Sequence, residues 1–479
     1  MNDDEIEIDN DEEEDDIVRN DSVSFLMLPD EIIAHIITYL DDKHKLSLLN
    51  TCKYLNSFKH IIEFTSYVHL AKIVELSYFN SFMKVIVGNT YYDLPKYVKF
   101  LKIDNNLKDK IKIPSSVTHL TFGYNFNQDI NDYIPNTVIN LTFGYCFNKS
   151  ITNCIPCSVK CLTFGDNFNQ PINSLPPSIR HLTFGRNFNQ VIVNDIPPYV
   201  INLTFGDNFN QSIENSIPNT TKYLRFGFNF DYPIDGHIPS SVTHLTLGSD
   251  FNKPIRKKLP NSITHLTFGF DYDYPIDGII PDSVINLILG NEFNQPIRER
   301  LPDSITHLSF GNCFNQIIFD ILPRSLIHIH FGNDFNKSIY GCLPDTLMFL
   351  KLGYHFNQPI DKCLPNSLIY LKFGLSFDQP IYNCIPDSVV YLIFGDRFNK
   401  PIKGCIPESV VYLRFGNCFN QSIVSSIPNK VRSIYFGNDF DHDINDNIPP
   451  SVKHINLGRG FKQHISDSLL KSVESITHY

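Results

Sequence analysis

Residues 113–133 read IPSSVTHLTFGYNFNQDINDY, and the stretch that follows, 134–154, reads IPNTVINLTFGYCFNKSITNC. The chain repeats this phrase seventeen times, with a proline near its start from Pro114 to Pro449. The prolines follow one another at a constant 21-residue period, shortened by one position in a single copy. Counted from the proline, the third place is mostly Val or Ile, the sixth Leu, the eighth Phe or Leu, and the twelfth and thirteenth Phe-Asn. Glycine at the ninth place and isoleucine at the sixteenth occur in every copy, and a sustained period of this length predicts a repeat architecture.

Each phrase is expected to form one closed coil. The alternation in Leu-x-Phe predicts a short strand with one buried face, because successive side chains of a strand point to opposite faces. The glycine is expected to turn the chain with a positive φ, which penalises residues that carry a Cβ. Asparagine after phenylalanine suits a second bend, where its side chain bonds the local backbone, and proline stiffens a third.

A single coil is expected to be unstable alone. Its few inward side chains do not offset the entropy lost by ordering the whole phrase, whereas a stacked neighbour covers the apolar rim and the open strand edge. The repeats therefore predict a mainly β fold, a parallel β-solenoid of 21-residue coils. Before the first phrase, the segment 94–111 keeps the apolar places but loses the glycine and the Phe-Asn pair, as a capping coil would. Its apolar residues are Val98, Leu101, Ile103, Leu107 and Ile111.

The charge of the chain is concentrated at its N-terminus. The formal net charge is −11, but residues 3–16 alone hold eleven Asp or Glu, which leaves 40 acidic and 40 basic residues elsewhere. The neutral remainder argues against broad electrostatic binding of nucleic acid or of an anionic membrane. Residues 1–22 are expected to be a disordered acidic leader, with a tail that binds a basic partner as the alternative.

The sequence also bears on the compartment. No apolar run reaches the roughly 18 residues of a membrane span, and the acidic N-terminus does not fit a signal peptide. We therefore expect the protein in the cytoplasm, the host cytoplasm if it is viral, or in the nucleus, with its eleven cysteines as reduced thiols.

The phrase resembles a known class of repeats. Read from the third place, VTHLTFGYNFN (residues 117–127) looks like the leucine-rich-repeat pattern L-x-x-L-x-L-x-x-N/C-x-L. Asn or Cys fills the N/C position of that pattern in the first six coils and at Cys313 and Cys418, so the family's asparagine ladder is expected to be partial. The FNxxI…IP spacing is closely similar to the FNIP repeat family, a leucine-rich-repeat relative of slime moulds and giant amoebal viruses. The resemblance covers about residues 94–476 and implies a leucine-rich-repeat-like solenoid.

A different module precedes the repeats. Residues 26–58, LMLPDEIIAHIITYLDDKHKLSLLNTCKYLNSF, predict two amphipathic helices, the first opened by Pro29. The segment resembles an F-box, whose pattern LPxEI…I…YL…L…L…CK implies a small all-α domain that docks onto the Skp-type adaptor of cullin–RING ubiquitin ligases. The aromatic residue, often Trp, that the family carries shortly after Cys-Lys is absent, and Tyr54 is the nearest aromatic residue. Carried onto this chain, the resemblance assigns adaptor docking to Leu28, Pro29, Ile32, Ile36, Leu46, Leu49 and Cys52.

These observations predict a domain order. The ranges are an acidic leader at 1–22, an F-box domain at 23–65, a connector at 66–93, a capping coil at 94–112, the solenoid at 113–468, and a C-terminal half-coil cap at 469–479.

Cysteine and histidine clusters favour structural roles. Cys154, Cys157 and Cys161 lie on different sides of one coil, which argues against a metal site. Cys342, Cys363, Cys384 and Cys405 recur with the period of the phrase and are expected to stack as thiols at a turn. Histidines at the fifth place favour a polar ladder over a surface metal site: His119, His181, His244, His265, His307, His328 and His454. No P-loop, G-x-S-x-G, H-E-x-x-H or G-x-G-x-x-G pattern occurs, so we expect neither an enzyme nor a cofactor.

The exposed strand positions change character along the chain. The seventh place is mostly Thr in the first half, which fits a strand surface. From the twelfth coil, aromatic residues occupy the fifth place and basic residues flank them at the seventh, a composition typical of interface hot spots. An aromatic ladder that only stabilises the sheet is the alternative. The predicted target-binding residues are Phe349, Lys351, Tyr370, Lys372, Tyr391, Tyr412 and Arg414.

Together the two modules imply a function. We expect a monomeric substrate-recognition receptor of an SCF-type ubiquitin ligase, with the F-box on a Skp-type adaptor, and through it cullin, and the solenoid on an unknown target protein. The alternative is a stand-alone protein-binding scaffold or decoy with no ubiquitin role. An enzyme with a β-helix groove would need clustered carboxylates or a nucleophile, and the sheet face carries Thr, His and Tyr instead.

Overall fold

The computed structural model describes residues 28–88, 93–103 and 111–478. The expected leader at 1–22 and Leu107 of the predicted capping coil lie outside these residues. The chain divides into two compact units, Met1–Thr221 and Lys222–Tyr479.

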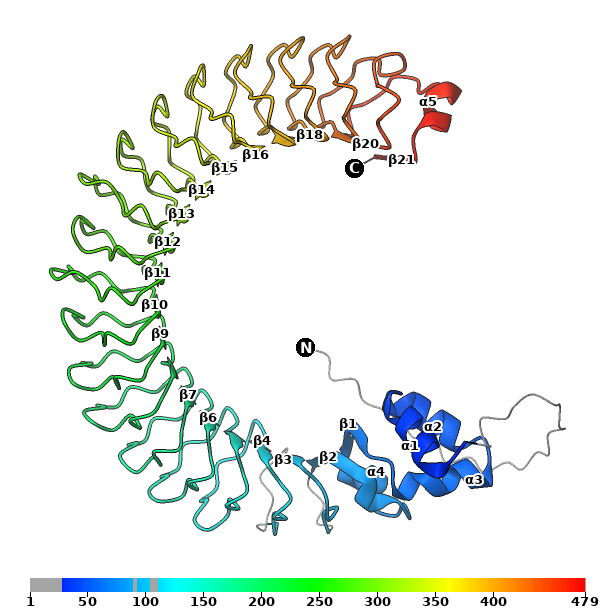
Figure 1. Cartoon of the computed structure of the whole chain (residues 1–479), viewed down its shortest axis with the longest axis vertical. Coiled ribbons are helices and arrows are strands. Elements are labelled where there is room, and N and C mark those ends of the chain that lie inside the picture. Colours follow the sequence, from blue (N-terminus) through cyan, green and yellow to red (C-terminus); the bar gives the residue numbers. More distant parts are fainter. Residues whose placement is uncertain (1–27, 89–92, 104–110, 479) are drawn as a thin grey trace. The chain divides into compact units, whose positions relative to one another are not determined.

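The first unit starts with helices and continues as a parallel sheet (Figure 1). The helices are α1 (Asp30–Thr38), α2 (Asp42–Leu49), α3 (Lys53–Asn56), the 3₁₀ helix η2 (Ser57–His60), α4 (Leu70–Ile73) and the 3₁₀ helix η3 (Phe79–Ser81). The strands are β1 (Phe64–His69), β2 (Phe82–Val87), β3 (Phe100–Ile103), β4 (His119–Phe122), β5 (Asn140–Thr142), β6 (Cys161–Thr163), β7 (His181–Thr183) and β8 (Asn202–Thr204). Each strand pairs in parallel with the next one along the chain.

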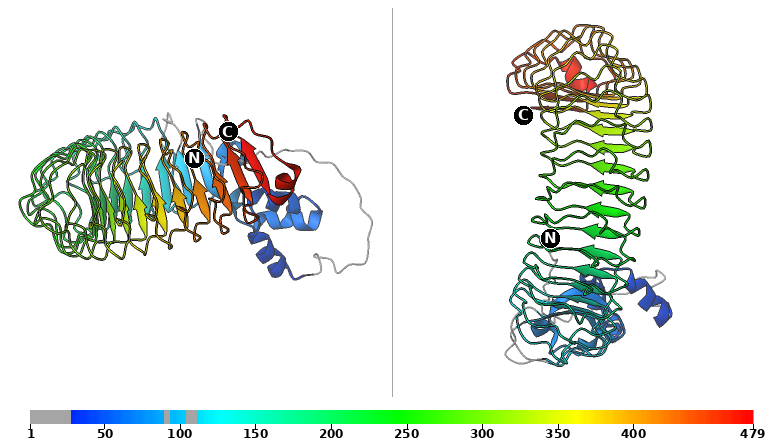
Figure 2. Two further views of the ribbon diagram at one scale, coloured as in Figure 1. Left: turned by 90° about the horizontal axis from the view of Figure 1, so that it is seen from above. Right: turned by 90° about the vertical axis from the view of Figure 1, so that its left-hand side faces the viewer.

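The second unit is a stack of coils with one strand each. Its strands are β9 (Tyr223–Arg225), β10 (His244–Thr246), β11 (His265–Thr267), β12 (Asn286–Ile288), β13 (His307–Ser309), β14 (His328–His330), β15 (Phe349–Lys351), β16 (Tyr370–Lys372), β17 (Tyr391–Ile393), β18 (Tyr412–Arg414), β19 (Ser433–Tyr435), β20 (His454–Leu457) and β21 (Ser475–His478), with α5 (Asp467–Ser472) before the last. Consecutive strands pair in parallel, and each strand residue lies opposite the residue at the same place of the next coil. Figure 2 shows the strands as the rungs of a ladder.

The predicted fold class is confirmed, and the apolar places form the core. In the coil that contains β17, Val389, Leu392, Phe394, Phe398 and Ile402 are all buried. Within such a strand only the central Leu points inward, while the fifth and seventh places remain at least partly exposed. Each coil therefore buries one side of a very short strand and leaves the other side to solvent.

Phenylalanine rings form two stacks in the core, of which the eighth-place stack is interrupted by leucine, as at Leu247, Leu289 and Leu352. Phe394 lies 4.1 Å from Phe398 in the same coil, between ring centroids. The eighth-place ring Phe394 lies 5.5 Å from Phe373 of the preceding coil, and the twelfth-place ring Phe398 lies 6.1 Å from Phe377. On the solvent face of the strands, by contrast, the His307 and His328 rings are only 4.3 Å apart. Neighbouring coils thus diverge away from their strands, which places the strands on the inner side of the curved second unit (Figure 1).

Glycine is required at the ninth place for a different reason from the positive φ that the sequence predicted. A positive φ is found instead three residues before the proline, at residues such as Asn153, Asp320 and Gly341. A Cβ added to Gly311 would lie 1.7 Å from the carbonyl oxygen of Gly290 in the preceding coil, and Gly332, Gly353 and others are similar. Glycine is required at the ninth place because two backbones approach closely there.

The thirteenth-place asparagine also differs from its prediction. Its side-chain oxygen accepts a hydrogen bond from the backbone N–H of the same place in the next coil, not from its own bend. Asn294 accepts from the Asn315 N–H at 2.9 Å, and Asn315 from the Asn336 N–H at 3.0 Å. Where the residue is Asp, as at Asp378, its carboxylate accepts from the Asn399 N–H in the same way. A ladder of Asn and Asp therefore joins the coils at this place.

A second polar ladder was not apparent from the sequence. In most coils that carry Ser or Thr two places after the proline, its hydroxyl donates to the backbone carbonyl of the third-place residue in the preceding coil, whereas the hydroxyls of Ser116, Ser158 and Ser451 have no such partner. Ser388 Oγ donates to Leu368 O at 2.7 Å, and Ser409 Oγ donates to Val389 O at 2.6 Å. These bonds satisfy carbonyl groups next to the core that would otherwise lack a partner.

The segment predicted as a connector, 66–93, differs in the structure. It carries most of β1 and all of β2, and β2 pairs with β3 over Lys84–Val87. Apolar β-branched residues explain the difference, since Val85 and Val87 are buried like the repeat core. The sheet of the first unit therefore begins directly after the helices and before the first phrase.

The glycine contact gives a test of the coil stacking. Gly311→Ala should lower the free energy of unfolding by about 2 kcal/mol or more, because the added methyl group forces the coils apart. The change is measured as a lower melting temperature by circular dichroism.

The matched control is Gly341→Asn. Gly341 has a φ of 66°, a Cβ added to it would meet no atom within 4 Å, and Asn occupies this place in other coils. This variant should stay within about 0.5 kcal/mol of the wild type. Equal melting temperatures for Gly311→Ala and the wild type would contradict the close-approach explanation.

Candidate functional site

Helix α1 carries two apolar rows, of which one lacks a partner in the described part of the chain. Ile33 and Ile37 are fully buried against the rest of the helical domain. Leu28, Ile32 and Ile36 are 37%, 45% and 38% exposed. Ile32 and Ile36 are spaced four apart and therefore lie on one side of the helix, while Leu28 precedes the helix, next to Pro29 at its N-cap. The row, together with the exposed Pro29, is an apolar surface suited to a protein partner.

The other predicted docking residues divide between surface and core. Leu46 and Cys52 are partly exposed. Leu49 is 0% exposed and packs in the same core as Leu55 and Phe58. The assignment of Leu49 to adaptor docking is therefore corrected: its side chain holds the helices together and cannot reach a partner.

Tyr54 links the end of the helical domain to its beginning. Its hydroxyl lies 2.5 Å from Asp30 Oδ1 at the start of α1, and its ring is 40% exposed. The hydrogen bond to Asp30 raises the pKa of Tyr54. The phenol thus stays a donor and fixes the N-terminal turn of α1, next to the exposed apolar row.

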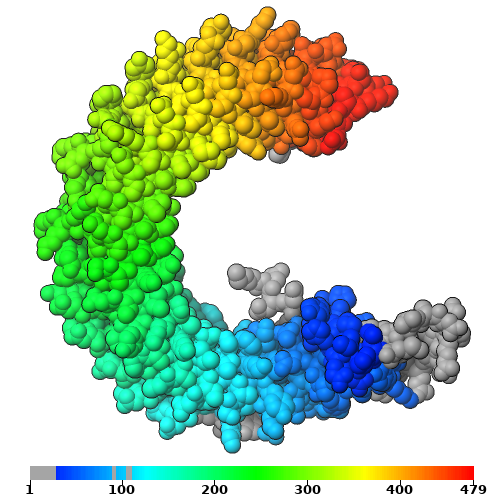
Figure 3. Space-filling model, viewed as in Figure 1, coloured from blue at the N-terminus to red at the C-terminus, as the bar shows by residue number. Residues whose placement is uncertain are grey.

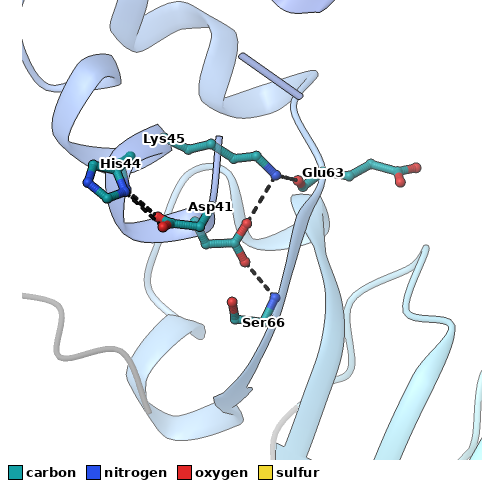
Figure 4. A network of polar contacts seen from close by, with 6 residues as sticks. Asp41, His44, Lys45, Glu63 and Ser66 are labelled. Carbon is teal, nitrogen blue, oxygen red and sulfur yellow. Dashed lines mark hydrogen bonds and ion pairs between the residues drawn. The ribbon is translucent and has the colours of Figure 1, made fainter. Parts of the chain in front are cut away.

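A buried ion pair joins the helical domain to the sheet of the first unit. Lys45 Nζ lies 3.1 Å from Asp42 Oδ1, and both side chains are almost completely buried. Lys45 also donates to the Glu63 carbonyl at 2.9 Å, and Asp42 Oδ2 accepts from the Ser66 N–H in β1 at 2.5 Å. Figure 4 shows Lys45 directed at Glu63 beside this network. The helices are therefore fixed to the first strand and are not a flexible appendage.

The predicted target-binding residues lie together on the solvent face of β15–β18. Strand register places Phe349 opposite Tyr370, Tyr370 opposite Tyr391, and Tyr391 opposite Tyr412. Lys351 lies opposite Lys372, two places further along the same strands. Arg414 follows in β18 with Ile393 between. The structure thus brings the seven residues into two parallel rows, on the coils coloured yellow to orange in Figure 3.

The tyrosine row differs from the histidine rows of the same unit. His244 and His265 stack flat, with 4.2 Å between centroids and 9° between planes. Tyr370 and Tyr391 are 6.3 Å apart and tilted by 35°. Wider spacing and tilt leave part of each tyrosine ring uncovered by its neighbours, which favours a binding surface over a ladder that only stabilises the sheet.

A groove of ≈ 630 Å³ runs beside the tyrosine row along the seventh places of β14–β20. The ninth-place glycines line its other side and contribute no side chains. Its seventh-place residues are His330, Lys351, Lys372, Ile393, Arg414, Tyr435 and Asn456. His330, Ile393, Tyr435 and Asn456 were not among the predicted residues, although following the seventh-place column over every coil would have found them.

The groove is positively charged. Burial lowers the pKa of Lys351, and Lys372 lowers it further. Burial also lowers the pKa of His330, with Lys351 and Lys372 as further causes. Arg414 lies 6.0 Å from the centroid of the Tyr435 ring. Among the described residues, neither lysine nor Arg414 forms an ion pair with a carboxylate.

The cysteine clusters have no metal-binding geometry in the part of the chain that the structure describes. No group of three or more His, Cys, Asp or Glu there could hold a metal ion. In the predicted thiol stack, Cys363 and Cys405 are buried, and Cys342 and Cys384 are partly exposed. Burial raises the pKa of Cys363 to about 11, so this thiol is protonated at neutral pH. No helix among the described residues is both long and apolar enough to span a membrane.

Two family models match this chain. A model described as FNIP Repeat matches thirteen overlapping or adjoining segments between residues 109 and 460. A model of the F-box domain matches residues 25–66. The comparison with curated protein sequences gave no match.

Solved structures show the same kind of fold. A structure titled "The crystal structure of CroV588 a novel circular LRR protein structure" is 38% identical, with a TM-score of 0.74, over 86% of this chain and 68% of that one. YopM from Yersinia enterocolitica WA-314 is 15% identical, with a TM-score of 0.50, over 82% of this chain and 89% of that one. The second likeness concerns the fold alone. An F-box domain followed by a leucine-rich-repeat-like solenoid is the composition of a protein-interaction adaptor.

The buried ion pair gives one prediction. Asp42→Ala should lower the free energy of unfolding by about 3–5 kcal/mol, because it leaves Lys45 buried without its partner. The neighbouring Asp41 is exposed and caps α2 by accepting from the His44 N–H, so Asp41→Ala should cost much less than Asp42→Ala. Thermal melting followed by circular dichroism compares the two variants. Similar losses would show that the pair does not hold the helices to the sheet.

The stacked histidines give a second prediction, on pH. Burial lowers the pKa of His244 from its ordinary value of 6.5, and the neighbouring His265 lowers it further. The unfolded chain therefore binds the proton more readily than the folded protein, and stability falls as the pH drops below about 6.5. Replacement of both histidines by Asn, which occupies the fifth place at Asn286, should weaken this dependence.

The measurement is the melting temperature of wild type and variant between about pH 7.5 and about pH 5.5. His464→Asn serves as the control, since His464 is exposed and lies outside the strand face. The control should keep the pH dependence of the wild type. An unchanged dependence in the His244/His265 variant would rule out a contribution from this pair.

Proposed function

Because the chain belongs to the FNIP repeat family and carries an F-box domain, we propose that it is the substrate-recognition receptor of an SCF-type cullin–RING ubiquitin ligase. The exposed apolar row of Leu28, Ile32 and Ile36 is the single observation that carries this proposal. A row of this kind at the start of an F-box needs a protein partner to cover it. In this proposal a Skp-type adaptor covers the row, with Pro29, Leu46 and Cys52 at the edges of the contact.

The target protein binds to the strand face of the second unit. Phe349, Tyr370, Tyr391 and Tyr412 supply partly exposed aromatic surface on a rigid sheet, which costs little conformational entropy to immobilise. Lys351, Lys372 and Arg414 supply directional donors beside them. The receptor contributes proximity, while the other subunits of the ligase perform the transfer of ubiquitin. It acts as a monomer in the cytoplasm or nucleus.

Affinity capture from a lysate that contains adaptor and cullin tests the proposal. The Leu28→Ala/Ile32→Ala variant should lose at least about tenfold of the captured adaptor, since two apolar anchors are removed. Val191→Ala is the matched control, because Val191 is 63% exposed but lies in a solenoid coil. It should retain the adaptor in full.

A third variant separates the two surfaces. Tyr370→Ala/Tyr391→Ala/Tyr412→Ala should lose the target and keep the adaptor, while the F-box variant keeps the target. If the wild type captures no adaptor or cullin, the ligase role is wrong and a stand-alone scaffold remains.

A further inference from the structure

We propose that the groove along β14–β18 binds an extended acidic peptide segment of the target, with two carboxylates about four residues apart that pair with Lys351 and Arg414. This inference rests on the proposed function, since it names the chemistry of the target that the strand face receives. The occupant is a segment of protein and lies across the strands, along the column of seventh-place side chains.

The charge of the groove supports an acidic occupant. Register sets Lys351 directly opposite Lys372, and like charges in that position destabilise a sheet. The described residues offer these lysines no ion pair, and burial together with Lys372 lowers the pKa of Lys351. Among the described residues that line the groove, the one carboxylate is Asp396, against the three basic residues Lys351, Lys372 and Arg414. A ligand carboxylate would relieve the repulsion and satisfy the donors.

The spacing of the basic residues fits an extended peptide. Lys351 and Arg414 are three strands apart in the register, which corresponds to about 14 Å for strands about 4.8 Å apart. An extended peptide covers this distance in about four residues, and residues an even number apart point to the same side. Between the two charges lie Lys372 and the apolar Ile393. A peptide with acidic residues at i and i+4 and an apolar residue between them therefore matches the column.

The aromatic row argues for a peptide over a single-stranded nucleic acid. Bases bind by stacking on free ring faces, and a base inserted between two rings needs room for its own thickness in addition to the contact distance on each side. The rings from Phe349 to Tyr412 are 5.9 to 6.3 Å apart, so no base fits between neighbours. Tilted tyrosines with partly uncovered edges instead suit the side chains and backbone of a peptide.

The experiment measures binding of a dye-labelled peptide of about nine residues, with Glu at two positions about four apart and Val, Ser and Thr elsewhere, by fluorescence anisotropy with the full chain. A second peptide carries Gln in place of Glu. The protein variant is Lys351→Thr/Lys372→Thr/Arg414→Thr, which uses the residue found at the seventh place in β10 and β11. The control is Lys257→Thr/Lys403→Thr/Lys430→Thr, which removes the same charge from exposed lysines outside the groove.

The Glu peptide should bind the wild type and the control equally, and the groove variant at least about tenfold more weakly. The Gln peptide should bind at least about tenfold more weakly than the Glu peptide, and added salt should weaken the binding of the Glu peptide. Circular dichroism melting establishes that the groove variant is folded.

Three results would overturn the inference: equal binding of the Glu and Gln peptides, equal weakening by groove variant and control, or tighter groove-dependent binding of a dye-labelled single-stranded RNA of the same length. Adaptor capture by the same proteins separates the two proposals. If the peptide fails while adaptor and target are still captured, the acidic-peptide inference is wrong and the receptor function stands. If the peptide binds but the wild type captures no adaptor, the ligase role is wrong.

Discussion

The close approach of two backbones at the ninth-place glycine controls the rest of the solenoid. The place where a Cβ of Gly332 would sit is only 1.7 Å from the carbonyl oxygen of Gly311, so no other residue can occupy it without moving the coil. This contact fixes one coil on the next at a single point of the phrase. Residues at the same place of successive coils then become neighbours, and rows of like side chains follow directly from the repeat. The phenylalanine stacks, the Asn/Asp ladder and the serine ladder all depend on this alignment.

Alignment also explains how a uniform scaffold can carry a local binding surface. The fifth and seventh places point away from the core, so their side chains can change from coil to coil without disturbing the packing behind them. At the seventh place, Thr246 and Thr267 give way to Lys351 and Lys372 while the buried leucine of each strand is kept. The alignment places the like charges of Lys351 and Lys372 next to each other, and their repulsion destabilises the sheet. A repulsion of this kind, confined to a few adjacent coils, is expected where a ligand supplies the opposite charge.

The period, the core places and both modules could be predicted from the sequence, because they depend on composition at fixed spacing. The reason for the repeat glycine could not, since it is a contact between neighbouring coils, whereas the φ argument considers one residue alone. The residues with positive φ lie three before the proline, where the sequence carries mostly Asn, Asp and Gly, such as Asn153 and Gly236, because these residues tolerate a positive φ, although Lys362 and Ser425 adopt it too. Leu49 was misassigned because the family pattern identifies apolar positions, and only the packing shows that this side chain is buried inside the helical domain. Strands β1 and β2 lack the phrase, so the period could not reveal them.

The buried pair of Asp42 and Lys45 has a meaning that stability alone does not give. A buried ion pair contributes little net stability compared with apolar residues of the same size, because both charges lose their hydration. It does require one arrangement, since Lys45 must reach the Glu63 carbonyl while Asp42 accepts from the Ser66 N–H. The pair therefore fixes the orientation of the F-box helices on β1. A receptor that acts through proximity depends on orientation, because a misplaced target lysine reacts slowly even when it is bound. A buried ion pair at this junction is consistent with the proposed function, in which the direction of the exposed apolar row matters.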